Sequence, residues 1–257
     1  MIMKIKVMSY NVLCYGPDDM HWTIRHPMVT DLIKRECPDS FGVQEAHYDW
    51  MKTLSASLPE YDYVGVGRED GKQEGEFSAV FYLKDKFDVL DSGTFWLSET
   101  PDVAGSKGWD GACHRVCSWA KLQEKSSGEV YIHMNTHLDH RGPEARTKGL
   151  QLLLDFAKSF EEKIVLTGDF NFPEGCELYK QMTSGRLVDA KHATEDTMDS
   201  ITYNAFYPLR NDKGDPEIID FVNVSDDVKV NKYRVLTDRP DGKFPSDHYP
   251  VMAEIEV

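Results

Sequence analysis

The sequence lacks several features that mark large classes of proteins. Its five cysteines match neither a zinc-binding spacing nor a small disulfide scaffold, so we expect free thiols. No apolar run is long enough to cross a membrane and no secretory signal stands at the start, so we expect a soluble, cytoplasmic protein without a transmembrane segment. A glycine-rich phosphate loop and a nucleophile elbow are also absent, so neither kind of site is expected.

Positive charge is scarce as well. The chain has 29 lysines and arginines against 44 acidic residues, a formal net charge of −15. A protein that holds long duplex DNA through many phosphates needs the opposite balance, so tight binding of long duplexes is not expected. A local basic pocket, or a site in which a metal ion supplies the positive charge, remains compatible with this composition.

What is present is enough apolar material for one sizeable core. The 257 residues are 40% hydrophobic and show no internal repeat, low-complexity segment or linker, so we expect a single domain over 1–257 and a monomer. Helices are predicted over 22–36, 47–58, 143–160 and 175–182. The remaining periodic segments are predicted strands: 4–10, 41–45, 61–66, 76–83, 87–97, 115–122, 129–138, 164–166, 217–224, 229–237 and 251–257.

Most of these strands follow one another directly, as antiparallel neighbours do. The segments 76–83 and 87–97 are predicted to pair across the link 84–86. Helices follow the first, second and central strands. We therefore predict a four-layer α/β/β/α sandwich, in which two mainly antiparallel sheets pack face to face between helices.

The stretch Ile164 to Asn171 combines a short apolar strand with polar residues at its end. Alternation of side-chain direction would place Asp169 and Asn171 on one side and Phe170 on the other. Such a pair can hold a water or a hard cation and donate one N–H to an anion. An ordinary turn after a strand has the same composition, so both interpretations stay open from this stretch alone.

Polar residues follow strand ends in six places, which is the pattern of a site assembled at one rim of a sheet sandwich. Oxygen ligands from Glu45 and Asp247 suit Mg²⁺ or Mn²⁺, and histidines beside carboxylates suit proton handling or contact with an anion. The six places are Asn11, Glu45, the one-face set Asn135, His137 and Asp139, the pair Asp169 and Asn171, Asp220, and the pair Asp247 and His248.

The glycine-containing loop 98–113 is long for a compact domain. Trp96 and Trp109 bracket it, and we expect the loop to form the wall of a pocket. Packing of both indoles into the core is an equally good interpretation.

The ordered motifs resemble the endonuclease/exonuclease/phosphatase superfamily, the group that includes deoxyribonuclease I, deadenylases, inositol polyphosphate 5-phosphatases and bacterial sphingomyelinases. The resemblance covers nearly the whole chain. It rests on Ser-Tyr-Asn at 9–11, Gln44-Glu45, Asn135-Thr136-His137, Gly168-Asp169-Phe170-Asn171, Ile219-Asp220 and Ser246-Asp247-His248.

The resemblance also implies roles for the residues of these motifs. Glu45 would ligate the divalent ion with Asn11 and Asp247 close by, and Asp169 would orient and deprotonate the attacking water. Asn171 would donate to the phosphate, His248 would contact the scissile phosphate under the control of Asp220, and His137 would face the leaving-group side.

Glu76 lies where nuclease-type members carry a glutamate paired with the histidine at the position of His137, although a solvated edge glutamate is the alternative. Arg115 lies where such members contact phosphate, and Asn135 and Trp109 complete the expected substrate contacts.

The implied activity is Mg²⁺-dependent hydrolysis of a phosphoester, with Mn²⁺ as an alternative ion, by in-line attack of water. A phosphodiester is the favoured substrate, either a short nucleic acid, a lipid head group or another small molecule. The alternatives are a phosphomonoesterase and a non-catalytic binding module on the same fold.

Overall fold

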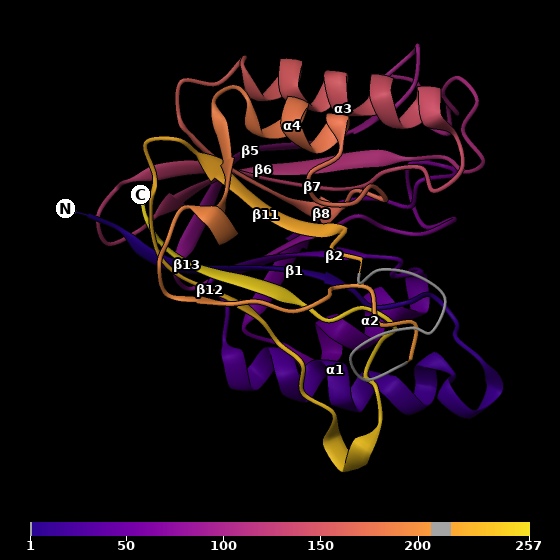
Figure 1. Cartoon of the computed structure of the whole chain (residues 1–257). Helices are drawn as coiled ribbons and strands as arrows, with labels where there is room; N and C mark the ends of the chain where they lie inside the picture. The colour runs from indigo at the N-terminus through magenta and orange to yellow at the C-terminus, as the bar shows by residue number, and fades with distance from the viewer. Residues whose placement is uncertain (1, 207–216) are drawn as a thin grey trace.

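Two β-sheets pack face to face between two layers of helices in the computed structural model, which describes residues 2–206 and 217–257 (Figure 1). Helices α1 (Trp22–Glu36) and α2 (Tyr48–Ser57) cover the outer face of one sheet. Helices α3 (Pro143–Ala157) and α4 (Glu177–Thr183) cover the outer face of the other. The predicted four-layer sandwich is therefore confirmed. None of the helices in the described ranges is both long and apolar enough to span a bilayer.

The strand order of the two sheets explains how distant segments meet. The first sheet has the order β10 (Thr197–Met198), β12 (Lys229–Val235), β13 (Val251–Glu256), β1 (Lys4–Asn11), β2 (Ser40–Gln44), β4 (Val80–Leu83) and β3 (Tyr61–Val64). The second has the order β5 (Phe87–Trp96), β6 (Val116–Glu124), β7 (Val130–His137), β8 (Lys163–Asp169), β11 (Asp220–Ser225) and β9 (Leu187–Asp189).

Strand directions bring the polar strand ends to one rim. Strands β1 and β2 are parallel, as are β7 and β8, so each pair ends at the same edge of its sheet. Strand β11 runs antiparallel to β8, and its first residue, Asp220, is paired with Asp169, the last residue of β8. Strand β13 runs antiparallel to β1, so the segment just before β13 lies beside the end of β1.

Alternating side chains divide the core into three clusters. In β1, Ile5 and Val7 pack between the sheets, whereas Met8 and Tyr10 pack under α1 and α2. A third cluster under α3 and α4 contains Leu150 and Phe221. All five cysteines are free, as predicted.

One predicted pairing is wrong. The link 84–86 makes a tight turn, with the Lys86 N–H donating to the Leu83 carbonyl, but β4 pairs with β2 and β3 while β5 pairs with β6. The chain thus crosses from one sheet to the other at this turn. Two apolar strands joined by a short link look like a hairpin in sequence, and only the packing of the sheets separates them.

Candidate active site

A pocket of about 450 Å³ opens at the rim where the strand ends converge. Its lining contains eight of the residues predicted from the sequence: Glu45, Glu76, Arg115, His137, Asp169, Asn171, Asp247 and His248. The structure therefore brings together side chains that are more than 200 residues apart in the chain. Asn11 and Asp220 lie directly behind this lining, in contact with Asp169 and His248 respectively.

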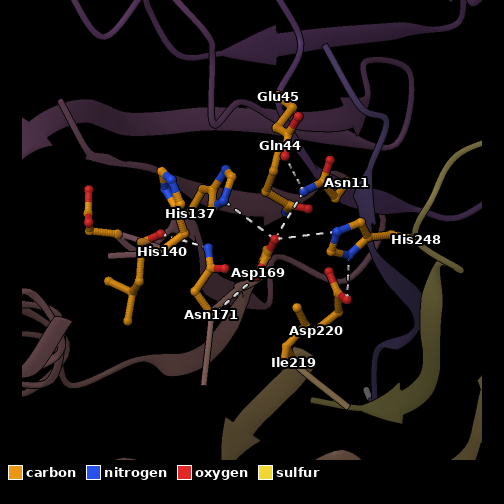
Figure 2. A network of polar contacts seen from close by, with 12 residues as sticks. Asn11, Gln44, Glu45, His137, His140, Asp169, Asn171, Ile219, Asp220 and His248 are labelled. Atoms are coloured by element: carbon orange, nitrogen blue, oxygen red, sulfur yellow. Dashed lines mark hydrogen bonds and ion pairs between the residues drawn. The ribbon is translucent and has the colours of Figure 1, made fainter. Parts of the chain in front are cut away.

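Asp169 is the centre of the polar network (Figure 2). Its Oδ2 accepts a hydrogen bond of 3.0 Å from the Asn11 amide and lies 3.4 Å from His137 Nε2 and 3.8 Å from His248 Nε2. Its Oδ1 accepts the backbone N–H of Asn171 at 3.0 Å. Burial, reinforced by the negative charge of Asp220, raises the pKa of Asp169 to about 7. A carboxyl with a pKa near neutrality is well matched to accept a proton.

His248 is held as an imidazolium. Burial alone would lower its pKa, but the charge of Asp220 and the 2.8 Å hydrogen bond between His248 Nδ1 and Asp220 Oδ2 raise the pKa of His248 well above its usual value. Both side chains are buried. The Nε2–H of this cation is left to face Asp169 and the pocket, where it can donate to an anion.

His137 has the opposite electrostatic environment. Burial, together with the positive charges of Arg115 and Arg68, lowers the pKa of His137 well below its usual value. The imidazole is therefore neutral, and its contact with Asp169 is not an ion pair. The two histidines that flank Asp169 thus differ in charge, which the sequence alone does not reveal.

The turns after β2 and β8 aim two more side chains at the pocket. Glu45 and Asn171 adopt left-handed backbone conformations, with φ of 60° and 51°. Strand β8 ends at Asp169, so it is this turn, and not continued strand alternation, that brings Asn171 into the pocket. One N–H of the Asn171 amide donates to the Leu138 carbonyl at 2.9 Å, which leaves the second N–H for a ligand.

Glu45 belongs to a group of side chains that could hold a metal ion. Its Oε1 accepts from the Asn11 amide at 3.0 Å and its Oε2 accepts from the Cys14 N–H at 3.1 Å. Ligand atoms of Glu45, His137 and Asp169 lie within 4.8 Å of one another. Asp247 lines the same pocket, and burial raises the pKa of its carboxyl although His248 opposes this effect. Several carboxylates in one pocket repel one another, and a bound divalent cation would relieve that repulsion.

Arg68 is a pocket residue that sequence reasoning missed, because it lies in the polar segment 67–75, which has no periodic pattern. Its guanidinium pairs with Glu76 at 2.6 Å. Glu76 precedes β4 instead of lying on it, and the structure gives it Arg68 as its partner in place of the expected histidine.

Arg115 is only 5% exposed; its Nη1 has no hydrogen-bond partner within residues 2–206 and 217–257, and its Nε has a 3.7 Å contact with Asp139.

Two other predicted substrate contacts lie outside the pocket lining. Asn135 is fully buried between the sheets, where it accepts from Gln44 at 2.7 Å and donates to the Val43 and Ala79 carbonyls. Trp109 is half-buried in the loop 98–113, and its role in substrate binding stays a prediction. Trp96 packs in the core and donates its indole N–H to the Arg68 carbonyl at 2.6 Å.

A polar seam joins the two sheets beneath the pocket. His133 of β7 contacts the Ser40 hydroxyl of β2 at 2.8 Å and the Thr167 hydroxyl of β8 at 3.0 Å. Thr167 in turn donates to the Asn135 amide oxygen at 2.9 Å. These hydrogen bonds join the first residue of β2 to residues inside β7 and β8. They fix the three strands relative to one another, and so they position the pocket residues that follow these strands.

Arg25 of α1 is a second residue missed from the sequence. Its side chain is completely buried and donates to the backbone carbonyls of Val12 at 2.5 Å, Leu13 at 2.7 Å, Met20 at 2.6 Å and Pro245 at 2.9 Å. The helix thereby holds the segment after Asn11 and the segment before Asp247 in one arrangement. A helical arginine gives no sequence signal for such a role.

Comparisons with known proteins find matches over nearly the whole chain. The model of the Endonuclease/Exonuclease/phosphatase family matches residues 8–248. A solved structure of a protein of that family from Bacteroides thetaiotaomicron is 36% identical, with a TM-score of 0.93 over 100% of this chain and 98% of that one. A mannosyl-6-phosphatase from the same organism is also 36% identical, with a TM-score of 0.91 over 98% and 99% of the two chains.

A more distant relative is a nuclease subunit. The 3'-5'-exoribonuclease subunit of the CCR4-Not complex from Aspergillus niger is 22% identical over 99% of this chain. The chain spans about half of the length of that protein, 52%.

Proposed function

The chain belongs to the endonuclease/exonuclease/phosphatase family, and on that basis we propose that it hydrolyses a phosphomonoester with the help of a divalent cation. Family membership supports hydrolysis of a phosphoester in general. The choice of a monoester is supported by the similar mannosyl-6-phosphatase and by the charges around the pocket.

The observation on which the proposal rests is the pair of guanidinium groups beside the carboxylates. Arg68 and Arg115 both line the pocket, and burial, together with the charge of Arg68, lowers the pKa of Arg115. Two neighbouring cations with unused hydrogen-bond donors are stabilised by an anion that bears more than one charge. A phosphomonoester has nearly two negative charges at neutral pH, whereas a phosphodiester has one.

The residues present fit a divalent cation. Glu45 would hold it, with Asn11 and Asp247 close by, because oxygen ligands and uncompensated buried carboxylates favour a hard ion such as Mg²⁺ or Mn²⁺. When bound, such an ion neutralises charge that develops on the phosphoryl and leaving oxygens.

The chain's own groups perform the remaining work. Asp169 accepts a proton from the attacking water, and the Asn11 amide and the Asn171 backbone N–H hold its carboxylate in position. The imidazolium of His248 and the free N–H of Asn171 donate to phosphoryl oxygens. The water attacks in line with the leaving group, and no covalent intermediate forms.

A phosphodiester is the second candidate. Tyr203 and Ile219 line the pocket on the side of His248, and the Tyr203 ring packs against that histidine at a tilt of 55°, with 5.0 Å between ring centroids. This surface would accommodate a second esterified group. The exonuclease relative gives the same candidate independent support, and a short nucleic acid would be compatible with the net charge of −15.

Release of phosphate or alcohol from a panel of mono- and diesters, with Mg²⁺ and with a chelator, tests the proposal. We expect monoester hydrolysis that requires the ion and that falls at least about a thousandfold in Asp169→Asn. Asp88→Asn, a change of an exposed carboxylate on β5, is the matched control and should keep full activity. Full activity of Asp169→Asn would overturn the mechanism, and faster cleavage of diesters than of monoesters would overturn the substrate class.

A further inference from the structure

A second cavity continues the proposed active site away from Asp169. It has a volume of about 370 Å³, within the range of small-molecule sites, and shares Arg68 and Glu76 with the first pocket. We propose that this cavity binds the leaving group of the substrate and that this group is a sugar ring, so that the substrate is a phosphorylated carbohydrate. The inference rests on the proposed function and adds a binding subsite to it.

Aromatic side chains form one wall of the cavity. Tyr15 is 61% exposed and stacks on His47 with 5.0 Å between ring centroids. The rings of His47 and Trp22 lie at 88° to each other, with 5.1 Å between centroids. Tyr48 completes this wall. Ring faces are electron-rich, and the weakly positive C–H groups on one face of a sugar ring pack on them favourably.

The aromatic wall is held in place by the start of α2. His47 caps this helix, with its Nδ1 accepting the Trp50 N–H at 3.3 Å. Because Tyr15 lies on this fixed ring, its own ring is presented to the cavity as a firm surface.

Hydrogen-bond acceptors also line the cavity. Asp49, Glu69 and Glu76 provide carboxylates and Gln73 provides a carboxamide. Sugar hydroxyls are donors that match such acceptors. Among residues 2–206 and 217–257, Arg68 is the only arginine or lysine of the lining, and Lys52 pairs with Asp49 at 2.6 Å from outside it, so three carboxylates stand against two cations. The remaining negative charge repels a further phosphate, so a neutral polyhydroxylated group fits this cavity better than a nucleic-acid backbone does.

Glu69, Gln73 and Glu76 belong to an ordered loop. Asp70 Oδ1 accepts the backbone N–H groups of Lys72 at 2.7 Å and Glu74 at 2.9 Å, and the Arg68 N–H donates to the Glu76 carbonyl. The Arg68–Glu76 ion pair stands between the two cavities. A phosphoryl group on one side of this pair would place its esterified sugar on the other.

Binding to inactive protein tests the subsite without turnover. Isothermal titration of Asp169→Asn with hexose 6-phosphate and with inorganic phosphate, each in the presence of Mg²⁺, is compared with the double variant Asp169→Asn/Tyr15→Ala. We expect the second change to weaken hexose 6-phosphate binding about tenfold and inorganic phosphate binding less than twofold. Leu90→Ala, which removes another exposed apolar side chain, is the matched control on β5 and should leave both affinities unchanged.

Turnover gives a second measure. In otherwise wild-type protein, Tyr15→Ala should lower kcat/KM for hexose 6-phosphate about tenfold more than kcat/KM for ethyl phosphate, which has no ring. Equal losses for both esters, or no loss for either, would overturn the subsite. If Tyr15→Ala lowered kcat/KM more for a nucleoside 5'-monophosphate than for the hexose phosphate, the cavity would bind a nucleobase and the proposed sugar subsite would be overturned. Absence of any ester hydrolysis by the wild type would refute the proposed function, while the titrations would still report on the subsite.

Discussion

His133 gives a prediction about acid stability that follows directly from the polar seam. Its ring is completely buried between Ser40 and Thr167, and burial lowers its pKa from 6.5 to about 3. The folded protein therefore holds a neutral imidazole that the unfolded chain protonates more readily. We expect that in His133→Gln the free energy of unfolding falls less on acidification than it does in the wild type.

The magnitude follows from the two pKa values. Because the folded-state pKa is the lower one, the contribution of His133 to the free energy of unfolding is fully present above pH 6.5 and is lost as the pH falls towards 3. Between pH 7.5 and 4.5 the loss amounts to about two pKa units, or about 3 kcal/mol. All other titrating groups are shared by the wild type and the variant, so their effects cancel in the difference.

Urea unfolding at a series of pH values measures this difference. His133→Gln should be less stable than the wild type at pH 7.5, because it loses buried hydrogen bonds, but the gap should shrink by about 3 kcal/mol at pH 4.5. A gap of the same size at both pH values would refute the assignment of a neutral buried imidazole.

Three further changes test the site and its support. Asp220→Asn keeps the size of the side chain but removes the charge that holds the adjacent imidazolium, and kcat/KM for a phosphoester should fall about 10- to 100-fold. Glu45→Gln should abolish most of the thermal stabilisation by Mg²⁺, which for the wild type reaches about 3 kcal/mol at a hundredfold excess over Kd; an equal shift in both proteins would contradict its role as a ligand. Gly42→Ala would place a methyl group 2.1 Å from Asn135 Oδ1 and should cost about 1–3 kcal/mol in urea unfolding, whereas Gly185→Ala, with nothing within 4 Å, should stay within about 0.5 kcal/mol.

The fold and the convergence of the candidate site residues on one pocket are largely predictable from the sequence, for a physical reason. Buried strands show as apolar runs, and a polar residue shortly after such a run, such as Asp169 three residues after Leu166, marks the point where the chain leaves the core. The prediction of helix 22–36 matches α1 because its apolar stripe is regular and Cys37-Pro38 ends it.

What could not be predicted depends on long-range packing. The crossing between sheets at 84–86 has the local signature of a hairpin. Arg68 lies in a loop without periodicity, and its position beside Arg115 is fixed only in the folded chain. Asn135 lies two residues before His137 on the same face of a strand, and this spacing predicts a contact with the substrate. The side chain is instead fully buried, because spacing along a strand gives the face of a side chain but not its depth below the surface.

The hydrogen bonds from Arg25 to four backbone carbonyls have a consequence for how this sequence can diverge. The guanidinium binds peptide carbonyls, and every residue type has one. The side chains at 12, 13, 20 and 245 can therefore change without loss of these four hydrogen bonds. Lysine cannot replace it, because one ammonium group cannot reach four carbonyls spread around a planar fork. Among descendants of this sequence we therefore expect the arginine to be retained while the residues of the loops that it binds change.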